Sequence, residues 1–107
     1  MGIDLTVCPI RDDRPGYDRL QIDRDSELFD LVKQLPTLSI PDPVDFNWYE
    51  QDGIEKRATD EYGFPLTYCN AGQFRKIDAS KQEGWNHAVL MFLQALPPST
   101  PVVLWWH

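Results

Sequence analysis

Apolar and polar residues alternate at the start of the chain. Ile3, Leu5 and Val7 are apolar, and the residues that separate them are more polar. A period of two predicts a β-strand over residues 3–8 with one buried face. After a turn, a short second strand is predicted over residues 17–22.

The first helical pattern follows the second strand. Its apolar residues recur at the spacing i, i+3, i+4 and i+7, which predicts an amphipathic helix at about residues 26–35. Asp25 or Ser26 suits the N-cap, and Pro36 ends the helix. The apolar positions are Leu28, Leu31, Val32 and Leu35.

A second helix is predicted at about residues 80–96. Ser80 and Glu83 have the spacing of a capping box, and Pro97 and Pro98 end the pattern. We expect one apolar stripe of this helix to be buried. The stripe comprises Trp85, Ala88, Val89, Phe92 and Leu96.

The middle of the chain is rich in proline and in charged residues. Residues 37–44 are predicted to be an extended connection, and residues 46–49 a strand. The segment 50–61 is polar, and we expect a loop there. Asp52-Gly53 is a turn signal that alternatively closes a hairpin.

A turn followed by a strand is predicted over residues 62–69. Gly63 supplies backbone freedom, and Pro65 suits the start or the edge of a strand. Leu66 and Tyr68 would then share one face of that strand.

The end of the chain is its most apolar stretch. Residues 102–106 predict a strand that is apolar on both faces, which places it inside a sheet. Val102, Leu104 and Trp106 share one face, and Val103 and Trp105 share the other. We expect this strand to lie beside the first one.

Together these elements predict one α+β domain spanning residues 1–107. Their order is β(β)αββαβ, and the simplest arrangement is two layers, with two helices on one face of a mixed, mainly antiparallel sheet. The other face, around Val103 and Trp105, then packs under the middle of the chain or lies in the interface of a homodimer.

Charge and thiols limit the possible functions. The formal net charge of −7 disfavours nucleic acid and membranes as partners, because both bind proteins with excess Lys and Arg. No signal peptide is recognised, so we expect a cytoplasmic protein with reduced thiols. Cys8 and Cys69 lack Cys-x-x-Cys spacing and are interpreted as buried structural thiols, which are neighbours if their strands pair.

Few residues qualify for catalysis. His87 is interpreted as a boundary histidine with one hydrogen bond, and His107, the last residue, as mobile. Their spacing predicts no metal site, and no cofactor is expected. Carboxylates gather in the middle of the chain, at Asp42, Asp45, Glu50, Asp52, Glu55, Asp60 and Glu61. They fit a solvated surface, a metal-assisted hydrolase, or an acidic surface that docks on a basic protein.

Aromatic residues and the acidic segment supply the candidate contact residues, because accessible Trp and Tyr often anchor protein interfaces. The set is Trp48, Tyr49, Asp52, Glu55, Asp60, Glu61, Tyr62 and Trp105. Since no nucleophile, base and orienting group are assembled, the sequence favours a binding protein over an enzyme. We expect a non-enzymatic accessory factor whose partner is a protein with a basic or mixed surface. The alternative is a carboxylate-dependent, metal-assisted hydrolase.

Three runs of residues carry a resemblance to other proteins. They are Met1-Gly2-Ile3-Asp4-Leu5, Glu61-Tyr62-Gly63-Phe64-Pro65-Leu66, and Leu96-Pro97-Pro98 with Val103-Leu104-Trp105-Trp106-His107. With these runs the chain resembles, from end to end, a group of small proteins of tailed phages and prophages. The resemblance implies an accessory protein that works inside a bacterial cell, and no particular reaction. It also implies an inhibitor of a host defence or regulatory protein.

Overall fold

The computed structural model describes residues 3–10, 19–39, 46–50, 53–57 and 59–107, with the backbone alone for 46–50 and 53–57. The strands are β1 (Leu5–Pro9), β2 (Leu20–Ile22), β3 (Leu38–Ser39), β4 (Phe46–Glu50), β5 (Gly53–Arg57), β6 (Thr67–Asn70) and β7 (Pro101–Trp106). The helices are α1 (Ser26–Lys33) and α2 (Gly84–Ala95), with 3-10 helices η1 (Ala71–Lys76) and η2 (Ala79–Lys81) between β6 and α2. The predicted α+β fold is confirmed, and β3 and β5 are strands that the predicted order lacks.

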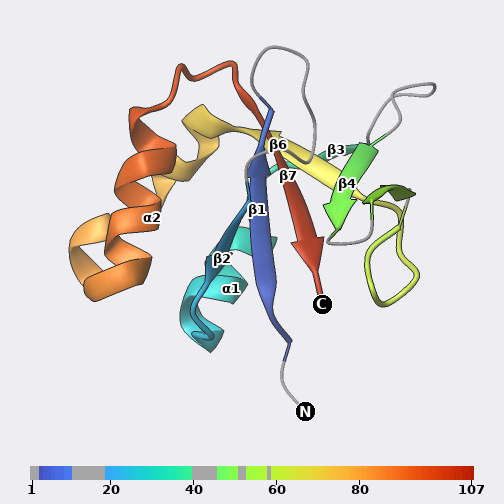
Figure 1. Ribbon diagram of the computed structural model, residues 1–107. Coiled ribbons are helices and arrows are strands. Elements are labelled where there is room, and N and C mark those ends of the chain that lie inside the picture. The colour runs from blue at the N-terminus through green and yellow to red at the C-terminus, as the bar shows by residue number, and fades with distance from the viewer. Residues whose placement is uncertain (1–2, 11–18, 40–45, 51–52, 58) are drawn as a thin grey trace.

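Five strands form one sheet in the order β2-β1-β7-β6-β3. The first and last strands lie side by side in its centre (Figure 1), as predicted, and their register runs from Leu5 opposite Trp106 to Pro9 opposite Val102. Beyond β7, His107 N donates to Asp4 O (2.9 Å) and Asp4 N donates to His107 O (2.6 Å).

All described strand pairs are antiparallel, whereas the sequence predicts a mixed sheet. The reason lies in the segment that connects β6 to β7. Asn70 at the end of β6 is opposite Pro101 at the start of β7, and Ala71 N donates to Thr100 O (2.8 Å). The helices between these strands thus leave and rejoin the sheet at one place, so β7 returns antiparallel beside β6.

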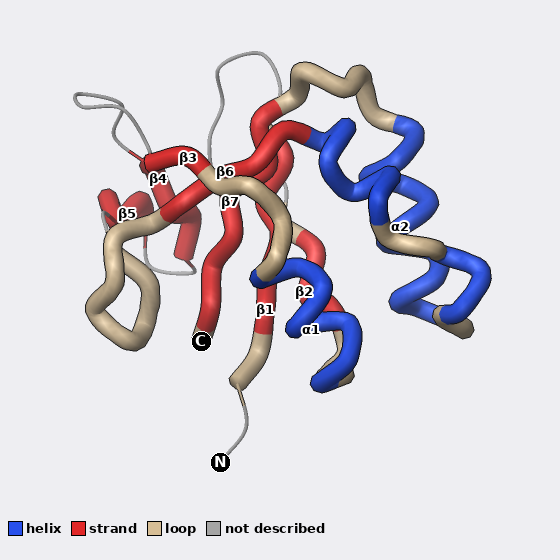
Figure 2. The backbone as a smooth tube through the Cα atoms, turned by 180° about the vertical axis from the view of Figure 1, so that it is seen from behind, coloured by secondary structure: helices blue, strands red, loops and turns tan. Residues whose placement is uncertain are grey.

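Helix α1 covers one face of the sheet. The Asp25 carboxylate caps it by accepting a hydrogen bond from Leu28 N (3.0 Å). Phe29 is buried and meets Trp106 edge to face, with ring centres 5.6 Å apart. Leu31, in the predicted apolar set, is 43% exposed. The buried side of α1 is therefore rotated toward Phe29, and Figure 2 shows this helix in front of β1 and β2.

The second face of the sheet is closed within one chain. Cys8 and Val103 have no exposed surface, and they cluster with Leu66 and with the partly buried Tyr68 and Trp105. This packing confirms that Leu66 and Tyr68 share a face. It also removes the reason to bury Val103 in a dimer.

The two thiols lie on opposite faces of the sheet. Cys8 in β1 is opposite Val103, and Cys69 in β6 is opposite Val102. Neighbouring residues of β7 point to opposite faces. The thiols are therefore not neighbours, and both are buried and reduced.

Helix α2 begins later than predicted. Ser80 lies in η2, where its hydroxyl donates to Asp78 Oδ1 (2.6 Å) and so does not cap α2. The helix starts at Gly84, which has a φ of +59°, and the side chain of its N-cap residue Glu83 makes no capping hydrogen bond. The predicted capping box does not form because the Ser80 hydroxyl is hydrogen-bonded to Asp78, two residues before it.

The buried stripe of α2 also differs from the prediction. Trp85 and Phe92, expected in the core, are 49% and 44% exposed. The buried residues of this helix are Asn86, Val89, Leu90 and Leu93. The helix is apolar nearly all round, so its sequence does not single out one face.

A separate hairpin replaces part of the predicted loop at 50–61. β4 and β5 pair from Phe46 opposite Arg57 to Glu50 opposite Gly53. The hairpin alternative is therefore right, and the expected loop is wrong for residues 53–57. Figures 1 and 2 both place this hairpin on the side of the sheet away from α2.

Candidate functional site: an aromatic recess at the end of β7

Four segments that are distant in sequence form an open recess of about 320 Å³. We call it the aromatic recess. Its lining residues come from the chain before β1, the end of α1, the turn before β6 and the end of β7. They are Ile3, Lys33, Asp60, Tyr62, Phe64 and Trp106.

Hydrogen bonds stabilise the turn at residues 60–64, which carries Tyr62 and Phe64. Asp60 Oδ1 accepts from Tyr62 N (2.8 Å) and from Phe64 N (3.1 Å). In the backbone, Asp60 N donates to Phe64 O (2.9 Å) and Gly63 N donates to Asp60 O (3.2 Å). Gly63 has a φ of +82°, which a residue with a side chain rarely adopts. The turn is therefore held in one conformation by its own hydrogen bonds.

The aromatic side chains on this turn are exposed. Phe64 is 68% exposed and Tyr62 is 48% exposed, and Ile3 across the recess is 42% exposed. The turn is attached to β7 because Glu61 N donates to Trp106 O (3.2 Å). Phe64 and Tyr62 thus lie on a fixed backbone with their apolar surface in water, which makes the recess a candidate contact site.

Both signs of charge border the recess. The Lys33 ammonium lies 5.2 Å from the centre of the Trp106 ring, a cation–π geometry. Asp60 supplies a carboxylate on the same rim, and Glu61 follows it in the turn. Nearby, the Arg24 guanidinium bonds both carboxylate oxygens of Asp4 (3.1 and 2.9 Å) and lowers the pKa of Asp4. This pair ties the start of β1 to the segment before α1.

The predicted contact residues are only partly brought together. Asp60 and Tyr62 line the recess, and Glu61 is exposed on the same turn. Trp105 does not join them, because it points to the second face of the sheet. Trp48 and Tyr49 lie on β4 and Glu55 on β5, where the backbone alone is described, and Asp52 lies outside the described residues.

Trp106, Phe64, Ile3 and Lys33 are recess residues that the sequence analysis does not select. For Phe64 a signal exists in the sequence: Asp60 followed by Gly63 predicts a tight turn that exposes its next residue. For Trp106 the alternation of faces along the last strand correctly predicts that its side chain lies on the helix-covered face of the sheet. It does not show that Trp106 borders an opening there.

The two histidines differ in how well they match expectation. His87 Nδ1 donates to Ala79 O (2.7 Å), since a carbonyl only accepts, and the predicted boundary role is confirmed. His107, predicted to be mobile, is instead packed against its neighbours. Its Nε2 lies 2.9 Å from Thr6 Oγ1, and its ring stacks on Trp105 with centres 4.3 Å apart.

Two kinds of reactive site concern the described residues, a metal centre and an activated thiol. Among these residues, no group of three or more His, Cys, Asp and Glu side chains is placed to hold a metal ion. Burial raises the pKa of the Cys8 thiol to about 12 and that of Cys69 to about 11. Both thiols are therefore protonated near neutral pH and poor nucleophiles.

The thiols are expected to resist alkylation while the protein is folded. At pH 8 an iodoacetamide time course read by mass spectrometry should show both Cys8 and Cys69 unmodified, and addition of urea should release both for reaction. The pKa values of both thiols in the folded protein lie above the ordinary value of 9.0. The unfolded chain therefore loses these protons first, and the free energy of unfolding should fall as pH rises from about 9 toward 12. Rapid modification of native protein would contradict this placement.

Comparisons with known proteins leave the chain without a family assignment. A scan of protein-family models, a search of curated proteins and a search of solved structures each found no match. Within the described residues, no helix combines the length and the apolar character needed to span a membrane.

Proposed function

We propose that this protein is a non-enzymatic protein-binding factor whose contact surface is the aromatic recess. The observation that carries the proposal is the turn that holds Tyr62 and Phe64 in water beside Trp106. Aromatic side chains on a preorganised backbone contribute large contact area at a small entropic cost on binding. An apolar side chain of the partner would fill the recess.

The charges around the recess suggest the character of the partner. Asp60 on the rim and the net charge of −7 favour approach of a basic or mixed surface. Lys33 adds a position for a carboxylate of the partner. In the setting that the phage resemblance implies, the partner is a defence or regulatory protein of the bacterial cytoplasm, and binding inhibits it.

The hydrolase alternative has no support among the described residues. Asp60 already accepts two backbone hydrogen bonds in its turn. The side chains of Glu50 and Glu55 are not described, and Asp42, Asp45 and Asp52 lie outside the described residues. We therefore keep binding as the proposed function.

Phe64→Ala is expected to weaken partner binding by about 30-fold, which corresponds to about 2 kcal/mol for an aromatic anchor. The fold should be unchanged because the Phe64 side chain is 68% exposed. The immobilised protein is first used to capture its partner from bacterial lysate, identified by mass spectrometry. Calorimetry with the purified partner then compares wild type and variant.

Leu31→Ala is a matched control, since Leu31 is an apolar side chain of α1 that is 43% exposed. It should bind as tightly as wild type. Equal affinity of the Phe64→Ala variant would remove the recess from the interface. Failure of wild type to retain any protein, together with stoichiometric binding of a divalent metal, would favour the hydrolase.

A further inference from the structure

Helix α2 presents an apolar surface to solvent. Each of its exposed residues is small or apolar, and two of them, Trp85 and Met91, are each 49% exposed. The exposed set is Gly84, Trp85, Ala88, Met91, Phe92 and Ala95. A surface helix normally turns polar residues outward, so this face has the character of an interface.

The polar residues of α2 point inward and are hydrogen-bonded there. Asn86 Oδ1 accepts from Asp23 N (2.8 Å), and Asn86 Nδ2 donates to Asp23 O (3.0 Å). Gln94 Nε2 donates to Phe74 O (3.0 Å) and to Ile77 O (2.8 Å). These bonds, together with the bond from His87 to Ala79 O, fix the rotation of α2 about its axis. The apolar face is therefore a stable feature of the fold.

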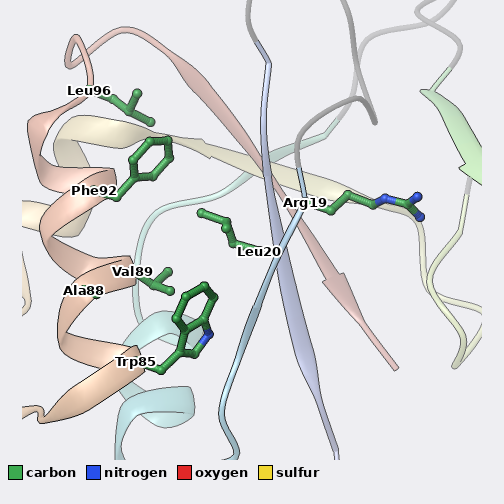
Figure 3. Close-up of a pocket in the computed structure, with 7 residues that line it drawn as sticks. All are labelled: Arg19, Leu20, Trp85, Ala88, Val89, Phe92 and Leu96. Atoms are coloured by element: carbon green, nitrogen blue, oxygen red, sulfur yellow. The ribbon is translucent and has the colours of Figure 1, made fainter.

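A groove runs beside this face, between α2 and β2, with a volume of about 540 Å³. Figure 3 shows Trp85, Val89 and Phe92 projecting from α2 toward Leu20 of β2, whereas Arg19 points away from the helix. The indole Nε1 of Trp85 donates to Gln21 O (2.6 Å). This bond sets the orientation of the Trp85 ring and satisfies a carbonyl of the outer strand.

Helix α2 differs from helix α1 in carrying no charged side chain. The helix contains no Asp, Glu, Lys or Arg, although the chain carries a net charge of −7. Two copies of an acidic protein repel each other over most of their surface. At the α2 face they can meet without burying like charges, and each gains cover for its exposed apolar side chains.

We propose that the α2 faces of two copies pack against each other in a two-fold symmetric homodimer. With the axis near Ala88 the two helices run antiparallel, and the small side chain at the crossing permits close approach of the backbones. Trp85 of one copy then lies against Met91 and Phe92 of its partner. The antiparallel arrangement also opposes the two helix dipoles favourably.

A second copy fits this face better than a foreign protein does. The apolar surface needs cover whenever the chain is folded, and another copy is always present with it. The α2 face is also remote from the aromatic recess: both tube and ribbon views place α2 and the turn before β6 on opposite sides of the sheet (Figures 1 and 2). The dimer therefore leaves both recesses open, and the inference is independent of the proposed function.

Analytical ultracentrifugation tests the dimer. Wild type at high micromolar concentration should sediment at twice the chain mass of 12.4 kDa. Ala88→Glu places two carboxylates at the axis and should sediment as a monomer with an unchanged circular dichroism spectrum, because position 88 is exposed and Glu favours helix. Leu31→Glu, a matched change on α1, should remain dimeric. A monomeric wild type, or a dimeric Ala88→Glu variant, would overturn the proposal.

A charge-reversal pair tests the position of the axis. Ala88→Lys alone should also be monomeric, because two ammonium groups meet at the axis. An equimolar mixture of the Ala88→Glu and Ala88→Lys variants should recover the dimer mass, since opposite charges then face each other. If the mixture stays monomeric while both variants are folded, the two copies do not meet at Ala88.

Discussion

Phe74→Ala is expected to lower the free energy of unfolding by about 3–5 kcal/mol. Phe74 lies on η1 and has no exposed surface. Among the described residues it is the largest side chain that is fully buried. Its removal leaves a cavity between the sheet and the helical segment, where it packs in the main core. Urea denaturation followed by circular dichroism measures the loss. In a domain of this size a change of this magnitude is a large fraction of the total free energy of unfolding.

Phe64→Ala provides the matched control for this experiment, because it is the same substitution at a side chain that is 68% exposed. It should change the free energy of unfolding by no more than about 0.5 kcal/mol. The same pair of variants also separates stability from binding, since only the Phe64 change affects the aromatic recess. A Phe74→Ala variant as stable as the Phe64→Ala variant would contradict the burial of Phe74 in the core.

Asn86→Ala is expected to cost about 2–4 kcal/mol of stability, because it leaves the N–H and the C=O of Asp23 without their partner. Asn86 is 7% exposed and is the side chain that joins α2 to the chain after β2. Its loss should lower the midpoint of thermal unfolding. Amide exchange at Asp23 should become faster at the same time, which distinguishes the lost hydrogen bonds from a general loss of packing.

Asn86→Asp refines this experiment because it preserves shape and volume. The carboxylate still accepts from Asp23 N, but it places an oxygen where Asn86 Nδ2 donates to Asp23 O. Most of the destabilisation should therefore persist near neutral pH. An Asn86→Asp variant as stable as wild type would show that the donor half of this bridge contributes nothing.

Local sequence alone determined the first and last strands and the presence of the first helix. In residues 3–8 and 102–106 a period of two assigns each side chain to a face of its strand, and Val103 and Trp106 lie on the opposite faces that this period predicts. The cap of α1 is equally local, because Asp25 bonds a backbone N–H three residues ahead. Such features need no information about distant parts of the chain.

The orientation of α2 was decided by tertiary structure. Its sequence is apolar on nearly every side, so periodicity assigns Trp85 and Phe92 to the core together with Val89. The inward hydrogen bonds of Asn86 and Gln94 fix the rotation of α2 about its axis. Their partners lie up to 63 residues away in sequence. No local pattern encodes those partners.

The candidate site shows the same division. The turn at 60–64 follows from its own residues, because Asp60 and Gly63 favour a tight turn wherever it is placed. The recess does not, since Ile3, Lys33 and Trp106 reach it only when the two ends of the chain pair in the sheet and α1 packs over them. Local chemistry therefore determines which side chains are displayed, and long-range packing decides which of them meet.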